Sequence, residues 1–319
     1  MKYLITGGAG FIGSHLAMRL LKDANEVVVL DDLSTGSEHF GEAQNNPNFM
    51  FVRGSVLDLK TLQKLPSDIE FVFHLAAAVG VFNIVKHPID SLKININGTE
   101  NILDFCKFHS LPVLITSSSE VYGKNVSNSL TETDDRIIGS PAIARWSYSE
   151  AKAIDEFLTL AYHREYGLET RVVRLFNTVG PGQLGSYGMV VPRFISAALK
   201  GADIEIYGTG TQTRCFTHVL DVIDALIAIS ESPKTIGEII NIGNTNEISI
   251  KGLAEKVIAI TKSKSRVVFK EYSEVYDSNF EDMQRRVPNI EKIRKLVGWM
   301  PKRTLEDIIQ DVIEHEKNG

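Results

Sequence analysis

The chain has 319 residues, of which 43% are hydrophobic and 23% charged, as in ordinary globular proteins. Its net charge of -6 argues against a protein whose overall field attracts nucleic acid or an anionic membrane. No apolar run reaches the roughly 18 residues that a membrane-spanning helix needs. No signal peptide precedes the first expected strand, so we expect a cytoplasmic protein.

Strand-like and helix-like segments alternate through the first half of the chain. Strands are predicted at 3–6, 26–30, 49–52, 70–75, 112–117 and 170–175, and helices at 12–21, 91–108 and 148–166. The near-continuous apolar run EVVVL at 26–30 is typical of a strand buried on both faces. This alternation predicts an α/β fold with a doubly wound parallel sheet.

The pattern loosens after about residue 176. Glycine and proline cluster in an expected loop at 180–188, and helices are expected near 190–200, 219–230, 250–262 and 304–316. We therefore predict a first domain over 1–176, to which 214–243 returns, and a smaller C-terminal domain over most of 177–319. The active site is expected between them.

The first turn of the chain carries a glycine-rich motif. Residues 6–16 read TGGAGFIGSHL, which satisfies GxGxxG from Gly8 and a wider spacing from Gly7 through Gly10 to Gly13. The motif follows a predicted strand and opens a predicted helix, at Phe11 and Ile12, which is the context that dinucleotide binding requires. Backbone amides and the helix N-terminus would then hold a pyrophosphate.

An acidic residue ends the second predicted strand. Asp31 lies 18 residues after Gly13, where a carboxylate accepts hydrogen bonds from the adenosine ribose, and Asp32 follows it. No lysine or arginine occurs from residue 31 through 40, which favours NAD over NADP. Asp58 is a candidate for the adenine amino group or, equally, a helix N-cap. Together these residues predict a Rossmann-type NAD-binding domain.

Candidate catalytic residues follow the later strands. Tyr148 and Lys152 are four residues apart and share one face of a helix, where the ammonium would lower the pKa of the phenol. Hydroxyl residues and a carboxylate end the fifth predicted strand, in the run LITSSSEVYG at 114–123. Cys106 and Cys215 have no metal-ligand spacing, so we expect buried free thiols and no metal site.

The chain resembles an extended short-chain dehydrogenase/reductase of the nucleotide-sugar epimerase, dehydratase and decarboxylase group. The motifs that carry the resemblance are TGGAGFIG, HLAAA (74–78), SSSEVYG (117–123), YSEAK (148–152), RLFNTVGPGQ (174–183) and GTQTRCFTHVLD (210–221). They cover nearly the whole chain in family order. The resemblance implies a Rossmann-type sheet with a smaller C-terminal substrate domain, tightly bound NAD, a UDP-sugar substrate and a homodimer paired through helices 91–108 and 148–166.

The resemblance also implies roles for single residues. Tyr148 would be the base, Ser118 would help with the O4 proton of the sugar, and Lys152 would also hold the nicotinamide ribose. The further residues that it implies are Glu120 as a fourth catalytic residue, Asn95 in a cofactor-facing loop, Ser119 at the substrate, and Asn177, Arg214 and one or both of Arg285 and Arg286 near the diphosphate. Arginine forks suit phosphate oxygens.

Three reactions share the 4-keto sugar that oxidation at C4 produces. The dehydratases of the family carry Asp-Glu before Val-Tyr-Gly, whereas this chain has Ser119-Glu120, which argues against dehydration. Ser-Glu and the run 282–289 resemble enzymes that handle UDP-glucuronate. The stretches 145–148 and 184–192 favour the epimerase branch, so the sequence predicts a UDP-glucuronate 4-epimerase.

Other functions remain open from the sequence. A UDP-glucuronate decarboxylase of the UDP-xylose synthase type is the next choice, because a 4-keto hexuronate is a β-keto acid. A UDP-glucose 4-epimerase follows it. A family member that only binds NAD as a sensor or scaffold should lack part of the catalytic set, and this chain has Ser118, Tyr148 and Lys152.

Overall fold

The computed structural model describes residues 1–36, 40–80, 84, 86–185, 189–274 and 281–318. Seven described strands form one parallel sheet: β1 (Lys2–Thr6), β2 (Glu26–Asp31), β3 (Phe49–Arg53), β4 (Phe71–His74), β5 (Val113–Ser118), β6 (Thr170–Leu175) and β11 (Ile239–Ile242). Their spatial order is β11-β6-β5-β4-β1-β2-β3. The order reverses between β1 and β4, and open α/β sheets bind ligands at the carboxyl ends of strands at such a point.

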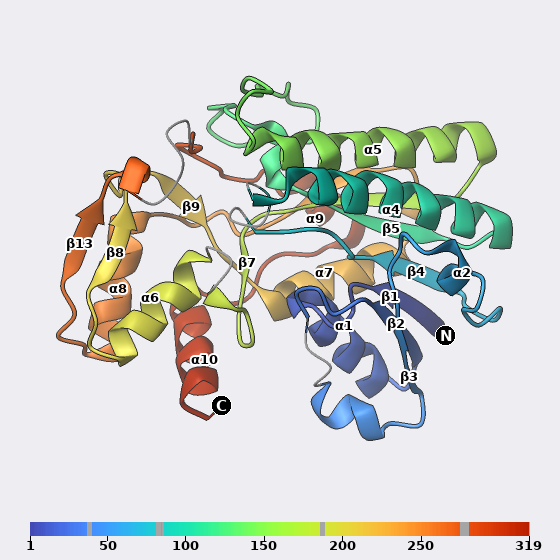
Figure 1. The fold of residues 1–319 in the computed structure, drawn as a ribbon, viewed down its shortest axis with the longest axis horizontal. Helices are drawn as coiled ribbons and strands as arrows, with labels where there is room; N and C mark the ends of the chain where they lie inside the picture. Colours follow the sequence, from blue (N-terminus) through green and yellow to red (C-terminus); the bar gives the residue numbers. More distant parts are fainter. Residues whose placement is uncertain (37–39, 81–83, 85, 186–188, 275–280, 319) are drawn as a thin grey trace.

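Helices cover both faces of this sheet (Figure 1). On one face lie α1 (Phe11–Lys22), α7 (Val219–Glu231) and α9 (Glu291–Val297), and on the other α2 (Leu59–Leu62), α4 (Pro88–His109) and α5 (Trp146–Tyr166). Successive side chains of a strand point to opposite faces, so in β1 Tyr3 and Ile5 join the first core and Leu4 joins the second. This two-sided burial explains why the strands read as continuous apolar runs.

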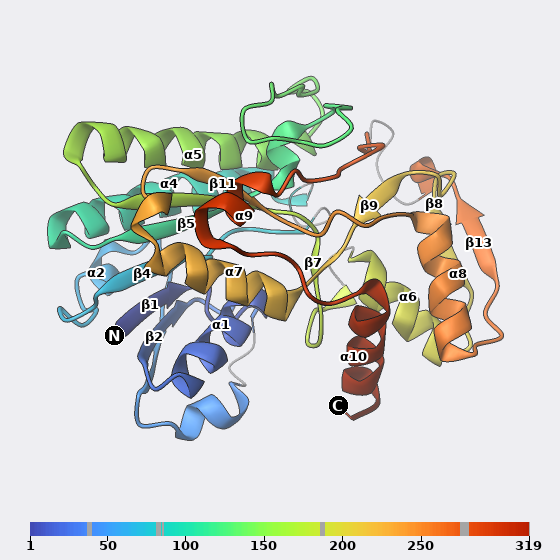
Figure 2. The same ribbon diagram turned by 180° about the vertical axis from the view of Figure 1, so that it is seen from behind.

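A second group of elements packs at one end of the sheet (Figures 1 and 2). Helices α6 (Val190–Leu199), α8 (Ile250–Thr261) and α10 (Leu305–Asn318) enclose a separate apolar core with β8 (Ile204–Tyr207) and β13 (Val267–Lys270). Two small ladders connect the groups: β7 (Thr178–Val179) with β10 (Thr217–His218), and β9 (Thr213–Cys215) with β12 (Glu247–Ser249). Short 3-10 turns are η1 (Gly41–Asn45), η2 (Ser119–Tyr122), η4 (Pro233–Thr235) and η5 (Tyr272–Glu274).

The parallel sheet predicted from the sequence is confirmed, as are the helices and strands predicted in the first half. The predicted loop at 180–188 includes residues 186–188, which lie outside the described residues. The sequence analysis missed the strands from β7 to β13 and the helix α9, which are two to seven residues long. The boundary at residue 176 and the return of 214–243 stay a proposal. No helix in the described ranges has the length and apolarity to cross a membrane.

A buried ion pair joins α5 to the sheet beside the site. Arg174 on β6 donates from Nε and Nη2 to the two carboxylate oxygens of Glu156 on α5, at 2.9 and 2.7 Å. Ser117 Oγ donates to the same carboxylate at 2.5 Å. Both charged side chains are at most 7% exposed, so each depends on the other for its partner. The pair fixes the register of α5 against β5 and β6.

We predict that Arg174→Met lowers the free energy of unfolding by about 3–5 kcal/mol, because it leaves the Glu156 carboxylate buried without a cation. Urea denaturation measures the change. Arg266→Met is the matched control, since it removes an exposed arginine paired with Asp203 and should leave the midpoint nearly unchanged. Equal midpoints for the two variants would contradict the assignment.

Candidate active site

A cavity of about 900 Å³ runs along the carboxyl ends of the central strands. The glycine-rich turn after β1, the loop after β4 and the end of β5 form one wall. The other wall comes from the C-terminal group of elements, including β9, the start of α6 and the segment 281–286. The cavity therefore lies at the switch point of the sheet, between the two apolar cores.

Close backbone packing shapes the glycine-rich end of the cavity. Gly7 has φ +70°, and a Cβ there would lie 2.6 Å from the backbone nitrogen of Ala76 after β4. A Cβ at Gly13 would overlap the carbonyl oxygen of Gly7. Only glycine accommodates both the positive φ and these approaches. The turn can therefore lie flat against the first residues of α1.

The N-terminus of α1 opens into this end of the cavity. Gly10 is its N-cap, no side chain caps it, and Gly10, Phe11, Ile12, Gly13 and Ser14 all line the cavity. The first amides of a helix have no intrahelical acceptor and carry partial positive charge. This end of the cavity can therefore accept an anionic group such as a pyrophosphate. The residues present thus fit the diphosphate of a dinucleotide.

Asp31 and Asp32 also line the cavity, at the end of β2. Asp31 accepts hydrogen bonds from the amides of Ala9 (2.9 Å) and Leu33 (2.8 Å), so its carboxylate is anchored to the glycine-rich turn. Burial raises the pKa of Asp31 above its ordinary value, although these two hydrogen bonds oppose the rise. The remaining lone pairs of an anchored carboxylate suit a ribose hydroxyl.

Two predicted cofactor residues do not reach the cavity. Asp58 caps α2, where it accepts from the amide of Lys60 at 3.0 Å and from the Thr61 hydroxyl at 2.7 Å. The contacts of Asp58 in this structure are therefore those of a helix N-cap. Ser55, three residues earlier in the chain, lines the cavity. Asn95 is fully buried and accepts from the amide of Ala78 at 2.9 Å. It positions the cavity-lining loop after β4 without lining the cavity itself.

The sequence brings a phenol, an ammonium and a hydroxyl together at the end of β5. Tyr148 and Lys152 on α5 and Ser118 at the end of β5 all line the cavity, and Tyr148 hydrogen-bonds to Ser118. Ser149 on α5 donates to the backbone oxygen of Glu120 at 2.7 Å, which holds η2 against the helix. This geometry suits proton transfer with an alcohol of a bound molecule.

The predicted lowering of the Tyr148 pKa needs a correction. Burial raises the pKa of the phenol, and the charge of Lys152 opposes this rise without offsetting it. Lys152 is itself almost fully buried and donates to Asp155 at 2.9 Å, a partner that the sequence analysis did not identify. Because Asp155 compensates part of the ammonium charge, Lys152 stabilises the phenolate less than an unpaired lysine would.

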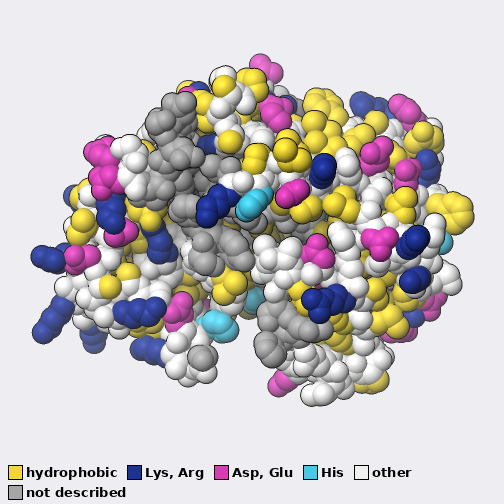
Figure 3. Space-filling view, viewed as in Figure 1, with side chains coloured by type: hydrophobic (Ala, Val, Ile, Leu, Met, Phe, Trp, Pro, Cys, Tyr) yellow, Lys and Arg dark blue, Asp and Glu magenta, His cyan; other side chains and the backbone are white. Residues whose placement is uncertain are grey.

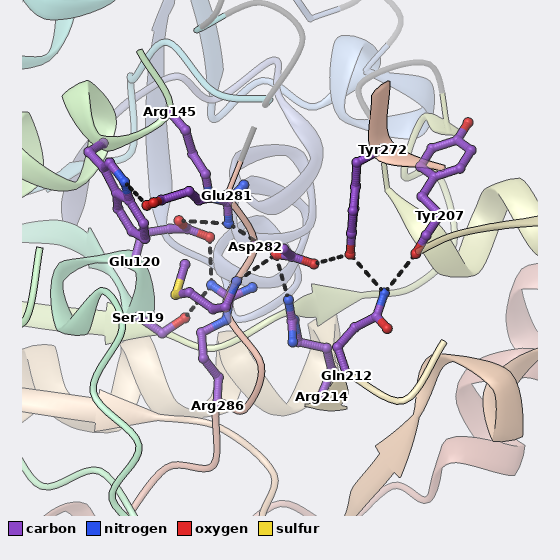
Figure 4. A network of polar contacts seen from close by, with 12 residues as sticks. Ser119, Glu120, Arg145, Tyr207, Gln212, Arg214, Tyr272, Glu281, Asp282 and Arg286 are labelled. Atoms are coloured by element: carbon purple, nitrogen blue, oxygen red, sulfur yellow. Dashed lines mark hydrogen bonds and ion pairs between the residues drawn. The ribbon is translucent and has the colours of Figure 1, made fainter. Parts of the chain in front are cut away.

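A network of buried charges, called the charged wall below, lies where the two sides of the cavity meet (Figure 4). Glu120 lies between two guanidinium groups, with Arg286 Nη1 at 2.6 Å and Arg145 Nη2 at 3.4 Å. Burial alone would raise the pKa of Glu120, but Arg145, Arg286 and Arg214 outweigh it and hold the pKa below its ordinary value. Glu120 is therefore an ionised carboxylate that orders arginines, and it has no proton to donate.

Ser119 and Asn177 extend this network as predicted cavity residues. Arg286 Nη1 lies 3.3 Å from Ser119 Oγ, and its Nη2 donates to Asn177 Oδ1 at 3.3 Å. Arg214 on β9 also lines the cavity, whereas Arg285 does not. Arg285 instead pairs with Glu247 at 2.7 Å, on the outside of the cavity. Of the two adjacent arginines, the structure thus brings only Arg286 to the site.

The sequence analysis assigned no role to Arg145 or Asp282, although they begin the segments 145–148 and 282–289 that carry part of the resemblance. Arg145 is three residues before Tyr148 and faces Glu120 because α5 begins there. Asp282 comes from a segment that is 137 residues distant from Arg145 in sequence, and only folding joins them. Tyr272 and Gln212 complete this wall. Among the described residues, no cluster of His, Cys, Asp and Glu could hold a metal ion.

The fold and this cavity define a short-chain dehydrogenase/reductase-type enzyme of nucleotide sugars, a class to which the comparisons with known proteins also lead. A family model described as GDP-mannose 4,6 dehydratase matches residues 4–312. The chain belongs to this family, whose relatives include epimerases, decarboxylases and dehydratases.

Individual relatives are similar over nearly their whole length. A UDP-N-acetyl-alpha-D-glucosaminuronate decarboxylase of Bacillus cytotoxicus is 39% identical, over 98% of this chain and 96% of its own. UDP-glucuronic acid decarboxylase 6 of Arabidopsis thaliana is 35% identical, over 96% of this chain and 86% of its own. The structure of UDP-glucuronic acid 4-epimerase from Bacillus cereus with UDP-glucuronic acid and NAD has a TM-score of 0.87 and 31% identity, over 100% and 99% of the two chains.

We predict that Gly13→Ala weakens NAD binding by about tenfold or more, because the added Cβ pushes the turn away from α1 at a cost of roughly 1–3 kcal/mol. Isothermal titration calorimetry with NAD measures the effect. Gly298→Ala is the control, since this C-cap of α9 lies outside the cavity lining and its added Cβ would meet no atom within 4 Å. Unchanged affinity in Gly13→Ala would contradict the proposed cofactor site.

Proposed function

We propose that this chain is an NAD-dependent decarboxylase that acts on a UDP-linked hexuronic acid. The observation that carries the choice of an acidic sugar is the charged wall, in which Arg286 and Arg145 flank Glu120 in the cavity that also contains Tyr148. The decarboxylase names of relatives at 35–39% identity support it. The sequence ranked this reaction second, behind 4-epimerisation.

The charged wall favours an acidic sugar over a neutral one. Desolvating several guanidinium groups is costly, and their charge is useful only where a substrate brings an anion. UDP-glucose carries its negative charges on the diphosphate alone, whereas a hexuronate adds one at C6. We therefore infer that the wall receives the C6 carboxylate, and that Asn177, which contacts Arg286 at the edge of the wall, lies toward the diphosphate.

The glycine-rich turn, the N-terminus of α1 and Asp31 would hold NAD, which when bound would supply an acceptor and later a donor of hydride at the sugar C4. Tyr148 takes the proton of the O4 hydroxyl, and Ser118 shares that hydrogen bond. Lys152 stabilises the phenolate by its charge, and Asp155 keeps the ammonium in place. Removal of the O4 proton by these residues, together with the hydride acceptance that NAD would supply, would leave a ketone at C4.

The ketone at C4 makes the C6 carboxylate that of a β-keto acid. The C5–C6 bond breaks, carbon dioxide leaves, and the electron pair of the bond passes through C5 and C4 to O4 as an enolate. A proton from water, admitted directly or through a side chain, then restores C5. Tyr148 and Ser118 stay beside O4, where negative charge develops, so hydrogen bonding there is strongest as the bond breaks.

We expect the purified protein to release carbon dioxide from UDP-glucuronate or its 2-acetamido analogue and to give a pentose-linked product. Mass spectrometry and proton NMR, with and without added NAD, identify the product. Tyr148→Phe should lower kcat by roughly 10²–10⁴-fold without unfolding, which is the usual contribution of a general base. The same loss is not expected from Phe269→Tyr, a change at an exposed side chain on β13.

Each other product would lead to a different conclusion. An isomer of unchanged mass would establish the 4-epimerase that the sequence favoured, the activity that names the Bacillus cereus structure. Turnover of UDP-glucose alone would remove the acidic-sugar assignment. Tight NAD binding without turnover of any of these substrates would favour a non-catalytic NAD-binding protein.

We also propose that the enzyme is a homodimer, paired through α4 and α5, and we retain the prediction of a cytoplasmic location. Hydrophobic side chains gather over these two helices (Figure 3). Phe108 on α4 is 81% exposed, and Phe157 and Ile154 on α5 are 65% and 38% exposed and one helical turn apart. Apolar surface of this kind on paired helices favours burial against a second copy.

We predict that Phe157→Asp converts the dimer to a monomer, because it places a charge in the proposed helix interface. Sedimentation velocity at several protein concentrations measures the state. Phe269→Asp makes the same substitution at another half-exposed phenylalanine, on β13, and should leave the dimer intact. A wild-type protein that is monomeric at all concentrations would disprove the proposal.

A further inference from the structure

Three cations and two anions meet in the charged wall of the cavity. The cations are Arg145, Arg214 and Arg286, and the anions are Glu120 and Asp282. Each of these five side chains is at most 18% exposed, and all five line the cavity. Three positive charges against two negative ones leave a net charge of one positive unit, equal and opposite to that of one carboxylate.

Asp282 occupies a defined place in this arrangement (Figure 4). Its Oδ1 accepts from Arg214 Nη2 at 3.0 Å, from Arg145 Nη2 at 3.5 Å and from the amide of Met283 at 2.8 Å. Its Oδ2 accepts from the Tyr272 hydroxyl at 3.1 Å. Arg145 thus bridges Asp282 and Glu120, while Arg286 pairs with Glu120.

Asp282 is an anion in this environment. Burial alone would raise its pKa, but Arg214, Arg145 and Arg286 outweigh burial and hold the pKa below the ordinary value. Arg286 retains one buried nitrogen, Nε, without a hydrogen-bond partner in the described structure. The arginines are therefore ordered by carboxylates of the protein, yet the wall still has positive charge for a substrate.

We propose that Asp282 is a positioning residue that limits the positive charge of the wall, so that the substrate carboxylate binds there and can still leave as carbon dioxide. The proposal rests on the function proposed above. Asp282 acts through Arg145 and Arg214, since its carboxylate oxygens contact these arginines and Tyr272.

The reason lies in the movement of charge during the reaction. As the C5–C6 bond breaks, the negative charge leaves the carboxylate and develops on O4, and neutral carbon dioxide departs. Positive charge beside the carboxylate stabilises the bound substrate more than the transition state, so an excess of it strengthens binding and slows the reaction. Asp282 keeps that excess at one unit, and its neutralisation would raise the excess to two.

The test is Asp282→Asn, which keeps the size of the side chain and removes its charge. We expect KM for the hexuronate to fall and kcat for carbon dioxide release to fall by roughly tenfold, because a unit charge is lost at close range in a desolvated site. A larger share of the 4-keto acid should then return as the 4-epimer. Thermal unfolding should shift to a lower temperature, because the buried Arg214 loses its carboxylate partner, whereas NAD affinity should equal that of the wild type.

Further variants separate charge from structure. Arg145→Gln combined with Asp282→Asn leaves two cations and one anion, which restores the single net charge and should recover most of kcat. Asp282→Glu keeps the negative charge and should retain most of the wild-type kcat. Glu281→Gln is the matched control, because this neighbouring carboxylate pairs with Lys124 and Trp146 outside the cavity lining.

The outcomes distinguish this proposal from the proposed function. If the wild type releases no carbon dioxide from either hexuronate, both are wrong. If the wild type is a decarboxylase, an unchanged kcat in Asp282→Asn overturns the charge-balancing role alone. A raised KM with kcat preserved would likewise overturn it, since that is the result of losing an ordinary binding contact. If Asp282→Asn does not fold, kcat is measured in the double variant Arg145→Gln/Asp282→Asn. A kcat close to that of the wild type supports the charge-balancing role, and a large loss of kcat overturns it.

Discussion

The contact on which the site depends is the ion pair between Glu120 and Arg286. Its atoms are 2.6 Å apart and 166 residues distant in sequence, and it joins the end of β5 to the C-terminal group of elements. Each charge is buried and depends on the opposite charges of the wall for its partners. By meeting there, they hold the second wall of the cavity over the sheet and orient the guanidinium toward the space beside Tyr148.

Much of the fold could be predicted because its strongest signals are local. The run EVVVL is apolar on both faces because helices cover both sides of β2, and the glycine spacing follows from the turn that packs Gly13 against Gly7. The missed elements are short. β8 reads IEIY, only four residues with half of them buried, and it forms by pairing with β13, which is 63 residues later along the chain. Such pairing leaves little trace in a local pattern.

The residues of the candidate site likewise divide into those with a local sequence signal and those without one. Ser118, Tyr148 and Lys152 are recognisable because one strand end and one helix face present them, and motif spacing reports both. Asp155 was missed although it is only three residues from Lys152, because a carboxylate on an amphipathic helix usually faces solvent. Asp58 shows the converse, since its local capping role was visible in the sequence and describes its contacts in full. Adjacent arginines at 285 and 286 could not be separated without knowing which faces inward.

The cavity therefore has two electrostatic ends with different tasks. At one end, Lys152 is matched by Asp155, so its charge does not offset the rise that burial causes in the pKa of Tyr148. At the other, three arginines exceed two carboxylates by a single charge. The proposed decarboxylation moves one negative charge from C6 to O4, so it would begin at the second end and finish at the first. Both ends pair their cations with carboxylates of the protein, which would prevent the charge from being held too tightly at either end.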